Sequence, residues 1–304
     1  MSSARTIAMS FTLLLMWLTV SAAARVQAAH TSPVGNVESE MRKTIAASGA
    51  EVSVALRILD GRDEVLIDPD RSFHAASTMK VPVMIELFRQ VRAGAISLSD
   101  TLEIRNEFHS IVDGSTFALS EGDDSDSLIY GAIGKSLTLE QLNEAMITVS
   151  SNFATNLLIE KLGVGKIRAT VDRLGASGMQ VLRGVEDQKA FEKGLNNSTT
   201  ARGLLVLFER IGRSKAVDPK SDAAMIAVLK RQKFNDGIPA GLPPGTEVAH
   251  KTGNITRIHH DAGIVYARRP YVLVILVRGI QEQKDSAALI ARLSATAYQA
   301  VERP

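Results

Sequence analysis

The 304-residue sequence contains no cysteine. Disulfide bonds, thiolate nucleophiles, cysteine-ligated zinc and a lipid anchor on cysteine are therefore excluded. Tryptophan is almost absent as well, because Trp17 is the only one. No apolar run reaches the ~20 residues that a membrane-spanning helix needs. A chain of this composition must depend on a packed core, and its length is sufficient to build one.

The N-terminal residues have the features of an export signal. Arg5 precedes an apolar run at residues 11–20, and Val26-Gln27-Ala28 fits the pattern of a signal-peptidase site. We expect a signal peptide at residues 1–28, with Ala22-Ala23-Ala24 as a second cleavage site and an uncleaved anchor as the alternative. The mature protein is then periplasmic or secreted, with no stable membrane anchor.

The charge balance bears on the class of partner. The formal net charge is +2, and the leader carries Arg5 and Arg25 but no acid, so the mature chain has equal numbers of acidic and basic residues. Nucleic-acid binding requires a surplus of basic residues. We therefore expect no nucleic-acid partner, and a monomer, because no exposed apolar helix is evident in the sequence.

Strand patterns lie at both ends of the chain and helical patterns lie between them. Alternation and β-branched residues predict strands at 52–59, 64–67, 247–255, 260–267 and 271–277. A 3.6-residue period predicts helices at 37–47, 79–91, 139–149, 153–162, 199–211, 219–233 and 285–301.

This order predicts an α+β fold. An antiparallel sheet flanked by the terminal helices would form one lobe from residues of about 29–76 and 214–304, and residues of about 77–213 would form an all-helical lobe. Ligand clefts commonly lie between such lobes.

The first candidate motif is Ser77-Thr78-Met79-Lys80, an S-x-x-K. Residues three apart on a helix share a face, so the Lys80 ammonium is expected within reach of the Ser77 hydroxyl. A partly buried lysine can activate a serine nucleophile. The apolar residues 81–85 favour burial of Lys80. Taken alone, the motif is weak, and a helix cap followed by a surface lysine is the alternative.

Two further motifs follow along the chain. Ser150-Ser151-Asn152 joins two predicted helices, and it is either a helix cap or part of a site. Lys251-Thr252-Gly253 lies on a predicted strand. Its lysine and hydroxyl could bind a carboxylate, and its glycine would allow a ligand backbone to approach. For Lys251-Thr252-Gly253, the alternative is an ordinary strand without a binding role.

The three motifs, about 70 and about 100 residues apart, resemble those of the penicillin-recognising serine acyl-transferases, most closely the class A serine β-lactamases. The resemblance covers essentially the whole mature chain. It implies that Ser77 is the acylated nucleophile and that Lys80 assists the transfer of its proton. It also implies that Ser150 passes a proton to the β-lactam nitrogen.

The resemblance also implies the substrate contacts. Asn152 would bind the side-chain amide of the substrate, and Lys251 and Thr252, followed by Gly253, would hold its carboxylate. The backbone N–H groups of Ser77 and Asn254 would form the oxyanion hole.

The sequence departs from the class A pattern at two places. Ser151 stands where these enzymes have aspartate, and we expect its side chain to point away from the ligand. The loop that carries the deacylating glutamate, roughly R-x-E-x-x-L-N, is altered. Glu186 follows Arg183 one residue late, whereas Glu192 has the expected relation to Asn196 but stands close to the next helix. We favour Glu186 as the base. The alternatives are Glu192, or that both are solvated loop acids.

These features predict an exported serine hydrolase that opens the β-lactam ring through a Ser77 acyl-enzyme and hydrolyses it with a loop glutamate. The alternative is a penicillin-binding D-Ala-D-Ala carboxypeptidase-like acyl-transferase with slow deacylation, and the third hypothesis is a non-catalytic binding protein. The ligand is then a small β-lactam or a D-Ala-D-Ala-like peptide.

No cofactor or metal is expected. Neighbouring residues of a strand point to opposite faces, so His259-His260-Asp261 offers at most two ligands to one ion. His259 is expected to be structural or to lie at the edge of the cleft. Arg257 either meets a substrate carboxylate or faces solvent.

Overall fold

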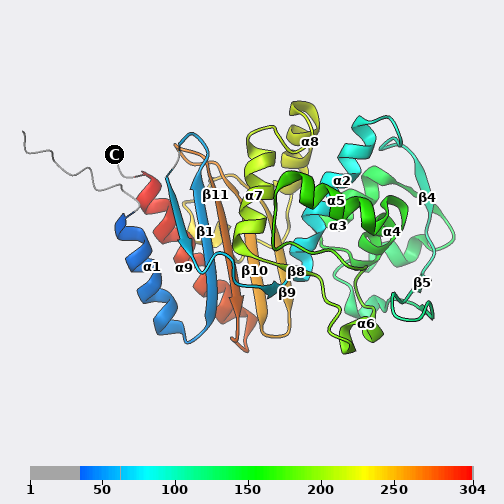
Figure 1. The fold of residues 1–304 in the computed structure, drawn as a ribbon, viewed down its shortest axis with the longest axis horizontal. Helices are drawn as coiled ribbons and strands as arrows, with labels where there is room; N and C mark the ends of the chain where they lie inside the picture. Colours follow the sequence, from blue (N-terminus) through cyan, green and yellow to red (C-terminus); the bar gives the residue numbers. More distant parts are fainter. Residues whose placement is uncertain (1–34, 62, 303–304) are drawn as a thin grey trace, which may run out of the picture. The chain divides into compact units, whose positions relative to one another are not determined.

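The computed structural model describes residues 35–61 and 63–302, so the predicted leader at residues 1–28 lies outside the described part. Strands from both ends of the chain form one antiparallel sheet of five strands in the order β2-β1-β11-β10-β9 (Figure 1). The strands are β1 (Glu51–Ile58), β2 (Glu64–Ile67), β9 (Val248–Ile255), β10 (Ile258–Val265) and β11 (Tyr271–Arg278). The predicted α+β fold is confirmed.

The central strand β11 is buried on both faces, from Tyr271 to Val277. Its successive residues face two different cores: Leu273 and Ile275 pack into one, and Val272 and Val274 into the other. A continuous apolar run is what a strand covered by helices on both sides requires.

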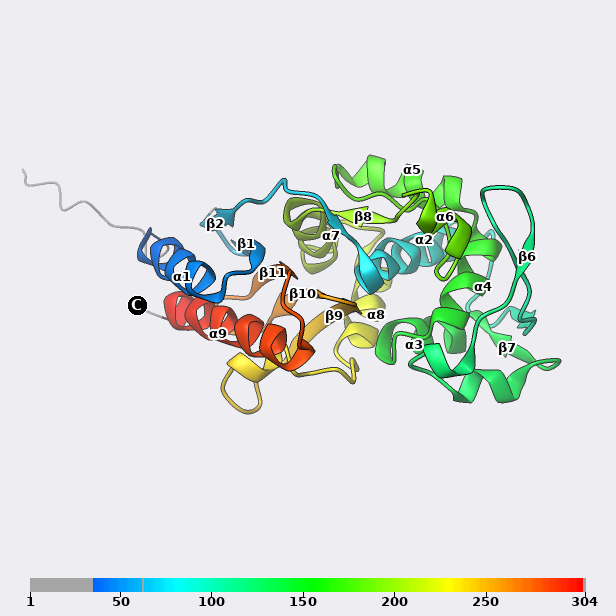
Figure 2. The ribbon, with the colours of Figure 1, turned by 90° about the horizontal axis from the view of Figure 1, so that it is seen from below.

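The two terminal helices cover one face of the sheet. α1 (Gly35–Ser48) and α9 (Gln283–Glu302) lie side by side (Figure 2). Met41, Leu289 and Leu293 pack with the sheet residues of this face.

The opposite face carries α7 (Ala201–Gly212) and α8 (Pro219–Leu229). α7, which the predicted division puts in the helical lobe, packs directly on β1, β10 and β11. α8 ends at Leu229 instead of continuing to residue 233. Beyond its end, the Gln232 side chain accepts hydrogen bonds from the backbone N–H groups of Lys233 and Phe234.

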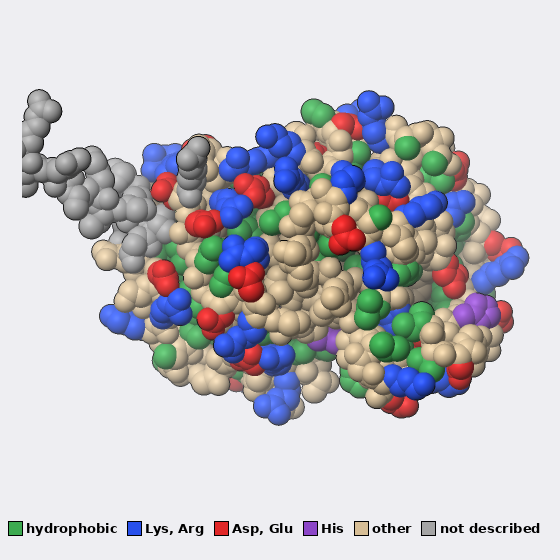
Figure 3. Space-filling view, in the orientation of Figure 1, with side chains coloured by type: hydrophobic (Ala, Val, Ile, Leu, Met, Phe, Trp, Pro, Cys, Tyr) green, Lys and Arg blue, Asp and Glu red, His purple; other side chains and the backbone are tan. Residues whose placement is uncertain are grey.

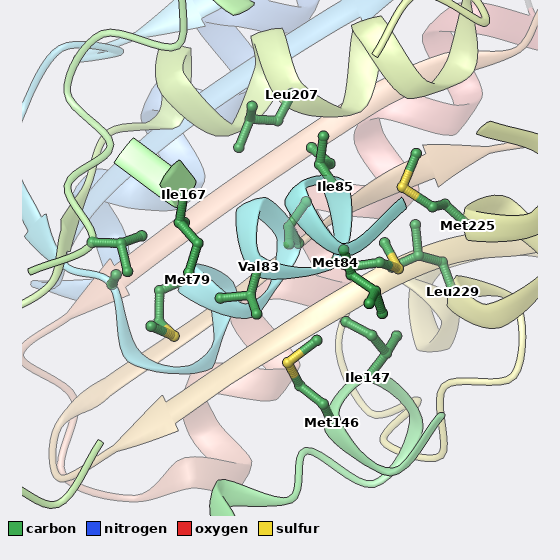
Figure 4. Close-up of a cluster of buried hydrophobic side chains, with 14 of the residues drawn as sticks. Met79, Val83, Met84, Ile85, Met146, Ile147, Ile167, Leu207, Met225 and Leu229 are labelled. Atoms are coloured by element: carbon green, nitrogen blue, oxygen red, sulfur yellow. The ribbon is translucent and has the colours of Figure 1, made fainter. Parts of the chain in front are cut away.

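The helix α2 (Lys80–Arg92) lies at the centre of the remaining helices, and its residues from Lys80 to Phe88 are all buried. Pro82 stands in its first turn, where a missing N–H costs no helical hydrogen bond. Figure 4 shows how side chains of α2 meet those of the surrounding helices, with methionines filling the space between them. This packing fixes the N-terminal end of α2, which carries Lys80.

The other elements are short. Three further helices are α3 (Leu139–Thr148), α4 (Asn152–Leu162) and α5 (Val164–Leu174). Single-turn 3₁₀ helices are η1 (Ala76–Met79), η2 (Glu121–Asp123), η3 (Leu128–Ala132) and η4 (Pro239–Gly241). Small two-stranded pairs are formed by β3 (Phe73–His74) with β8 (Ser198–Thr199), β4 (Thr101–Glu103) with β7 (Ser136–Thr138), and β5 (Phe108–His109) with β6 (Thr116–Phe117).

The segment 183–197, expected as a long loop, contains one short helix, α6 (Gln188–Glu192). Asp187 begins this helix, because its carboxylate accepts a hydrogen bond from the Ala190 N–H. A helix of about one turn shows no period, which is why the sequence pattern did not predict it.

All described residues belong to one compact unit. Acidic and basic side chains are intermingled on the face shown in Figure 3. Within residues 35–61 and 63–302, no helix combines the length and the apolar character needed to cross a membrane.

Candidate active site

A cavity of about 800 Å³ opens between the edge strand β9, the turn η1, the α3–α4 junction and the segment 183–197. Six of the predicted site residues line its wall: Ser77, Ser150, Asn152, Glu186, Thr252 and Asn254. The sequence did not predict several others that line it, among them His74, Asp123, Ser125, Phe191, Phe234 and Asp236.

Ser77 lies on η1 and faces this cavity. Its hydroxyl forms no hydrogen bond with any residue of the described chain, so it is open to a ligand. A Cβ at Gly253 would come within 3.1 Å of the Ser77 backbone nitrogen and 3.2 Å of the Ala76 Cβ. The space beside Gly253 is therefore occupied by the turn that carries Ser77.

Lys80 is fully buried and bonded to the α3–α4 junction. Its Nζ donates to the Ser150 carbonyl oxygen (2.6 Å), to Asn152 Oδ1 (2.9 Å) and to Ser150 Oγ (3.2 Å). Within the described chain Lys80 forms no hydrogen bond with Ser77. Burial lowers the pKa of Lys80 to about 7, although the charges of Asp124 and Glu186 oppose this effect. A large fraction of Lys80 is thus neutral at neutral pH and able to accept a proton.

Ser150 Oγ lies between two lysines. Lys251 Nζ donates to it over 3.0 Å and also to the Thr252 carbonyl oxygen over 3.0 Å. Burial, together with repulsion from Lys80, holds the pKa of Lys251 well below its usual range. A hydroxyl within hydrogen-bond distance of two amines can relay a proton between them.

The triplet 150–152 is both a helix start and part of the cavity wall. Ser151 is the N-cap of α4, and its buried hydroxyl accepts a hydrogen bond from the Ala154 N–H (3.2 Å). Ser151 does not line the cavity. The Asp124 carboxylate, which the sequence did not indicate, accepts the N–H groups of Asn152 (2.9 Å) and Phe153 (2.8 Å). Asp124 therefore holds Asn152 in place and adds a negative charge where the helix dipole favours one.

The structure places the two candidate glutamates differently. Glu186 lines the cavity, and its Oε1 accepts a hydrogen bond from Asn152 Nδ2 (3.3 Å). Partial burial and the nearby Asp123 raise the pKa of Glu186, whereas Arg183 lowers it. Glu192 lies on α6, outside the cavity wall, and its carboxylate is bonded to Gln188. Of the two, only Glu186 is brought next to Asn152.

Asn156 supports the backbone beside Glu186. Its amide makes two hydrogen bonds with Val185, accepting from the N–H (2.7 Å) and donating to the carbonyl (3.0 Å). A Cβ at Gly184 would come within 2.5 Å of Asn156 Oδ1, so this approach requires a glycine. The sequence motifs did not include Asn156. Its position four residues after Asn152, on the same face of α4, is the signal that could have identified it.

Backbone strain is concentrated at this cavity. Six described residues other than glycine have a positive φ, and three of them are Ala76 (45°), Ser150 (60°) and Glu186 (60°). The first precedes Ser77, and the other two are themselves predicted site residues. Such conformations persist where the surrounding structure enforces them, and they cluster at functional sites.

The remaining candidates are placed as follows. His259 lines the cavity, is 2% exposed, and has no partner for Nδ1 in the described chain. Asp261 pairs with His250 Nδ1 (2.8 Å). Arg257 lies exposed in the turn between β9 and β10, outside the cavity wall. Within the described ranges no cluster of three or more His, Asp or Glu side chains is arranged to hold a metal ion.

A serine open to a cavity beside two buried lysines, on a fold of this kind, is typical of serine acyl-transfer enzymes. The comparison with known proteins agrees with this class. A sequence model of the β-lactamase enzyme family matches residues 36–301, and the chain belongs to this family.

Individual relatives are distant. The extended-spectrum β-lactamase PER-1 of Pseudomonas aeruginosa is 22% identical over 275 residues, which cover 86% of each chain. The crystal structure of a β-lactamase from Sphaerobacter thermophilus DSM 20745 has a TM-score of 0.76 and 25% identity, and the match covers 88% of this chain and 99% of that one. The structure of PBP-A has a TM-score of 0.75 and 26% identity, over 88% and 96% of the two chains. A variant of PBP-A has been solved as an acyl-enzyme complex with penicillin G.

Proposed function

We propose that this protein is a class A-like serine β-lactamase, which opens the β-lactam ring through a Ser77 acyl-enzyme and hydrolyses that intermediate with Glu186. The observation that carries the proposal is the position of Ser150 Oγ between Lys80 and Lys251, in a cavity that the free hydroxyl of Ser77 also faces.

In the acylation step, Ser77 Oγ attacks the carbonyl carbon of the ring while its proton passes to neutral Lys80, either directly or through an ordered water. The C–N bond then breaks, and the ring nitrogen receives a proton from Ser150, which the two lysines resupply. The backbone N–H groups of Ser77 and Asn254 stabilise the oxyanion. The Ser77 nitrogen packs against Gly253, the residue before Asn254, which supports this pairing.

Substrate binding uses the two walls of the cavity. Thr252 meets the substrate carboxylate, and Lys251, which is fully buried, supports that contact through its bond to the Thr252 backbone. Asn152 meets the side-chain amide.

In the deacylation step, Glu186 removes a proton from a water that attacks the acyl carbonyl carbon. The bond from this carbon to Ser77 Oγ breaks, and the serine recovers its proton. The net reaction adds one water across the amide bond of the ring. Glu186 is favoured over Glu192 because it is the one that lines the cavity.

The experiment is a timed series of intact-mass spectra and ring-opening assays with the mature protein and benzylpenicillin. We expect a Ser77 adduct that disappears within seconds, and no hydrolysis by Ser77→Ala. An adduct that lasts for hours would favour the D-Ala-D-Ala carboxypeptidase-like alternative, with which the likeness to PBP-A is also consistent. No adduct with any β-lactam would overturn both readings and favour a binding protein.

We also propose that the protein is exported to the periplasm or medium and acts as a monomer. The apolar run at residues 11–20 and the small residues that follow it support export. N-terminal sequencing of the protein from fractionated cells is expected to begin after Ala28. Light scattering is expected to give the mass of one mature chain. Retention of the leader in a membrane fraction would contradict the export proposal.

A further inference from the structure

We propose that His74 is a positioning residue for the nucleophile: its Nδ1 holds the strained turn at Ala76 and thereby orients the Ser77 hydroxyl and backbone N–H. This inference rests on the proposed role of Ser77 as the nucleophile.

The contact that carries it is local. His74 is the last residue of β3, lines the cavity, and stands two residues before Ala76. Its Nδ1 accepts a hydrogen bond from the Ala76 N–H over 3.0 Å. Ala76 has a φ of 45° and is 7% exposed, so its strained backbone is enclosed by protein. A residue of this kind keeps its conformation only where its neighbours hold it.

The backbone of His74 is held by contacts with β8 and β10. Its backbone pairs with Ser198 of β8, and its carbonyl oxygen accepts a hydrogen bond from His260 Nε2 of β10 over 3.0 Å. The preceding residue, Phe73, packs its ring edge-on against the His260 ring, with centroids 5.6 Å apart. The backbone that carries the His74 imidazole is thus held by β8 and by the main sheet.

The other side of the turn is closed by β9. The Ala76 Cβ and the Ser77 nitrogen would both lie within 3.2 Å of a Cβ at Gly253, so the turn already packs tightly against this strand. The turn is therefore held between the bond to His74 and the backbone of β9. Rotation at Ala76 would move Ser77 Oγ and the Ser77 N–H together, and acyl transfer needs both in place.

The chemistry of the ring fits this role. A histidine nitrogen accepts a hydrogen bond only in the neutral ring, whose proton is then on the other nitrogen. Burial, together with the nearby Arg183, lowers the pKa of His74, so the ring is neutral at neutral pH. Nothing in the proposed reaction uses His74 as an acid or base, which leaves the Ala76 contact as its role.

The test compares His74→Asn with His74→Leu. The two replacement side chains have nearly the same shape, but only asparagine offers an oxygen that can accept the N–H two residues ahead, as in an Asx-turn. We expect the second-order rate constant for acylation by benzylpenicillin to fall about 10- to 100-fold in His74→Leu, which is the usual effect of a misplaced reacting group. In His74→Asn it is expected to stay within about threefold of the wild type, because an accepting oxygen restores the contact.

An unchanged rate in His74→Leu would overturn the inference, and so would equal losses in both variants, since those would indicate a packing role. If His74→Leu does not fold, His74→Gln replaces it. Its oxygen lies one bond further out, so a slow Gln variant beside a fast Asn variant is the expected result.

The inference and the proposed function fail in distinguishable ways. A wild-type protein that forms no adduct refutes the function alone. Hydrogen exchange of the Ala76 amide, which donates to His74 Nδ1, then tests His74 independently: we expect protection in the wild type and His74→Asn, and its loss in His74→Leu. Equal protection in all three would refute the contact.

Discussion

Glu186 and Glu192 carry the same side chain six residues apart, and they differ in their surroundings. Glu186 lines the cavity and bonds to Asn152, whereas Glu192 is exposed, does not line the cavity, and bonds to Gln188 of its own helix. Replacing Glu186 by Gln keeps the shape but removes the proposed base, so deacylation is expected to slow by about 10²- to 10⁴-fold. Timed intact-mass spectra should then show the acyl-enzyme accumulating.

Glu192→Gln is the matched control for that variant. It makes the same chemical change at an exposed position, so its acyl-enzyme is expected to disappear as quickly as that of the wild type. Accumulation in Glu192→Gln, with none in Glu186→Gln, would reverse the assignment of the base.

The pH dependence of deacylation follows from the surroundings of Glu186. Partial burial and then the charge of Asp123 raise its pKa, so it takes up a proton at a higher pH than an ordinary glutamate. As the pH falls, the carboxylate takes up a proton and can no longer act as a base. Because its pKa is raised, this loss begins at a higher pH than for an ordinary glutamate. Asp123→Asn removes one repelling charge, so the acid limb of the deacylation rate should move to lower pH.

The comparison for this shift is Asp236→Asn, which removes a carboxylate from another part of the same cavity wall. Asp236 is not among the main groups that act on Glu186, so its variant should keep the wild-type midpoint. Equal shifts in the two variants would indicate a general effect of the net charge of the cavity.

At the scale of single residues, the sequence motifs predicted the candidate site residues. They did not predict the residues whose hydrogen bonds hold the backbone of the site in place. Lys80, Ser150 and Lys251 lie far apart in the chain, and the motif resemblance grouped them before the structure showed their hydrogen bonds. His74 and Asp124 act on backbone N–H groups of other residues. Such contacts depend on how loops meet in the fold, and no pattern of residue types marks them.

At the scale of elements, the hairpin β5–β6 is tied to the segment that carries Glu186. The Asp187 carboxylate accepts the Ser110 hydroxyl (2.9 Å) and the Ile111 N–H (2.9 Å), and it also caps α6. Asp187 is 2% exposed. Lys189 adds an exposed ion pair to Asp113 of the same hairpin.

Asp187→Ala should therefore loosen the segment 183–197. It removes a helix cap and leaves the buried Ser110 hydroxyl without its acceptor, which costs about 2 kcal/mol of unfolding free energy. We expect faster hydrogen exchange in this segment, slower deacylation, and an unchanged rate of acylation of Ser77. Urea denaturation and exchange mass spectrometry give these quantities.

Lys189→Met is the control for that variant. Its ion pair is screened by solvent, so both stability and exchange are expected to change little. If the two variants loosen the segment equally, the buried carboxylate has no special role. The contact of Asp187 with the hairpin is a second reason why α6 was not predicted. The start of α6 depends on Asp187, and Asp187 is held by a hairpin more than 70 residues away in the chain.

At the scale of the whole molecule, both ends of the chain build the sheet whose edge strand carries Lys251. β11 pairs with β1 on one side and with β10 on the other, and β10 pairs with β9. A change at the centre of the sheet should thus reach the active site through strand pairing. The sequence predicted this arrangement because β-branched and apolar runs are concentrated at the two chain ends.

Leu273→Ala tests that coupling. Leu273 is fully buried on β11 and pairs with Leu56 and Gly263, so its truncation should lower the unfolding free energy by about 2–5 kcal/mol. The control is Leu128→Ala, the same substitution at a residue that is 87% exposed, which should change stability by less than about 0.5 kcal/mol.

Trp17 lies in the predicted leader, so unfolding of the mature protein in urea is followed by circular dichroism, with the fraction able to acylate measured at each urea concentration. In both variants we expect the circular-dichroism curve and the acylation curve to have the same urea midpoint, because the site and the sheet unfold as one cooperative unit. Loss of acylation well before loss of secondary structure would show instead that the cavity opens independently of the sheet.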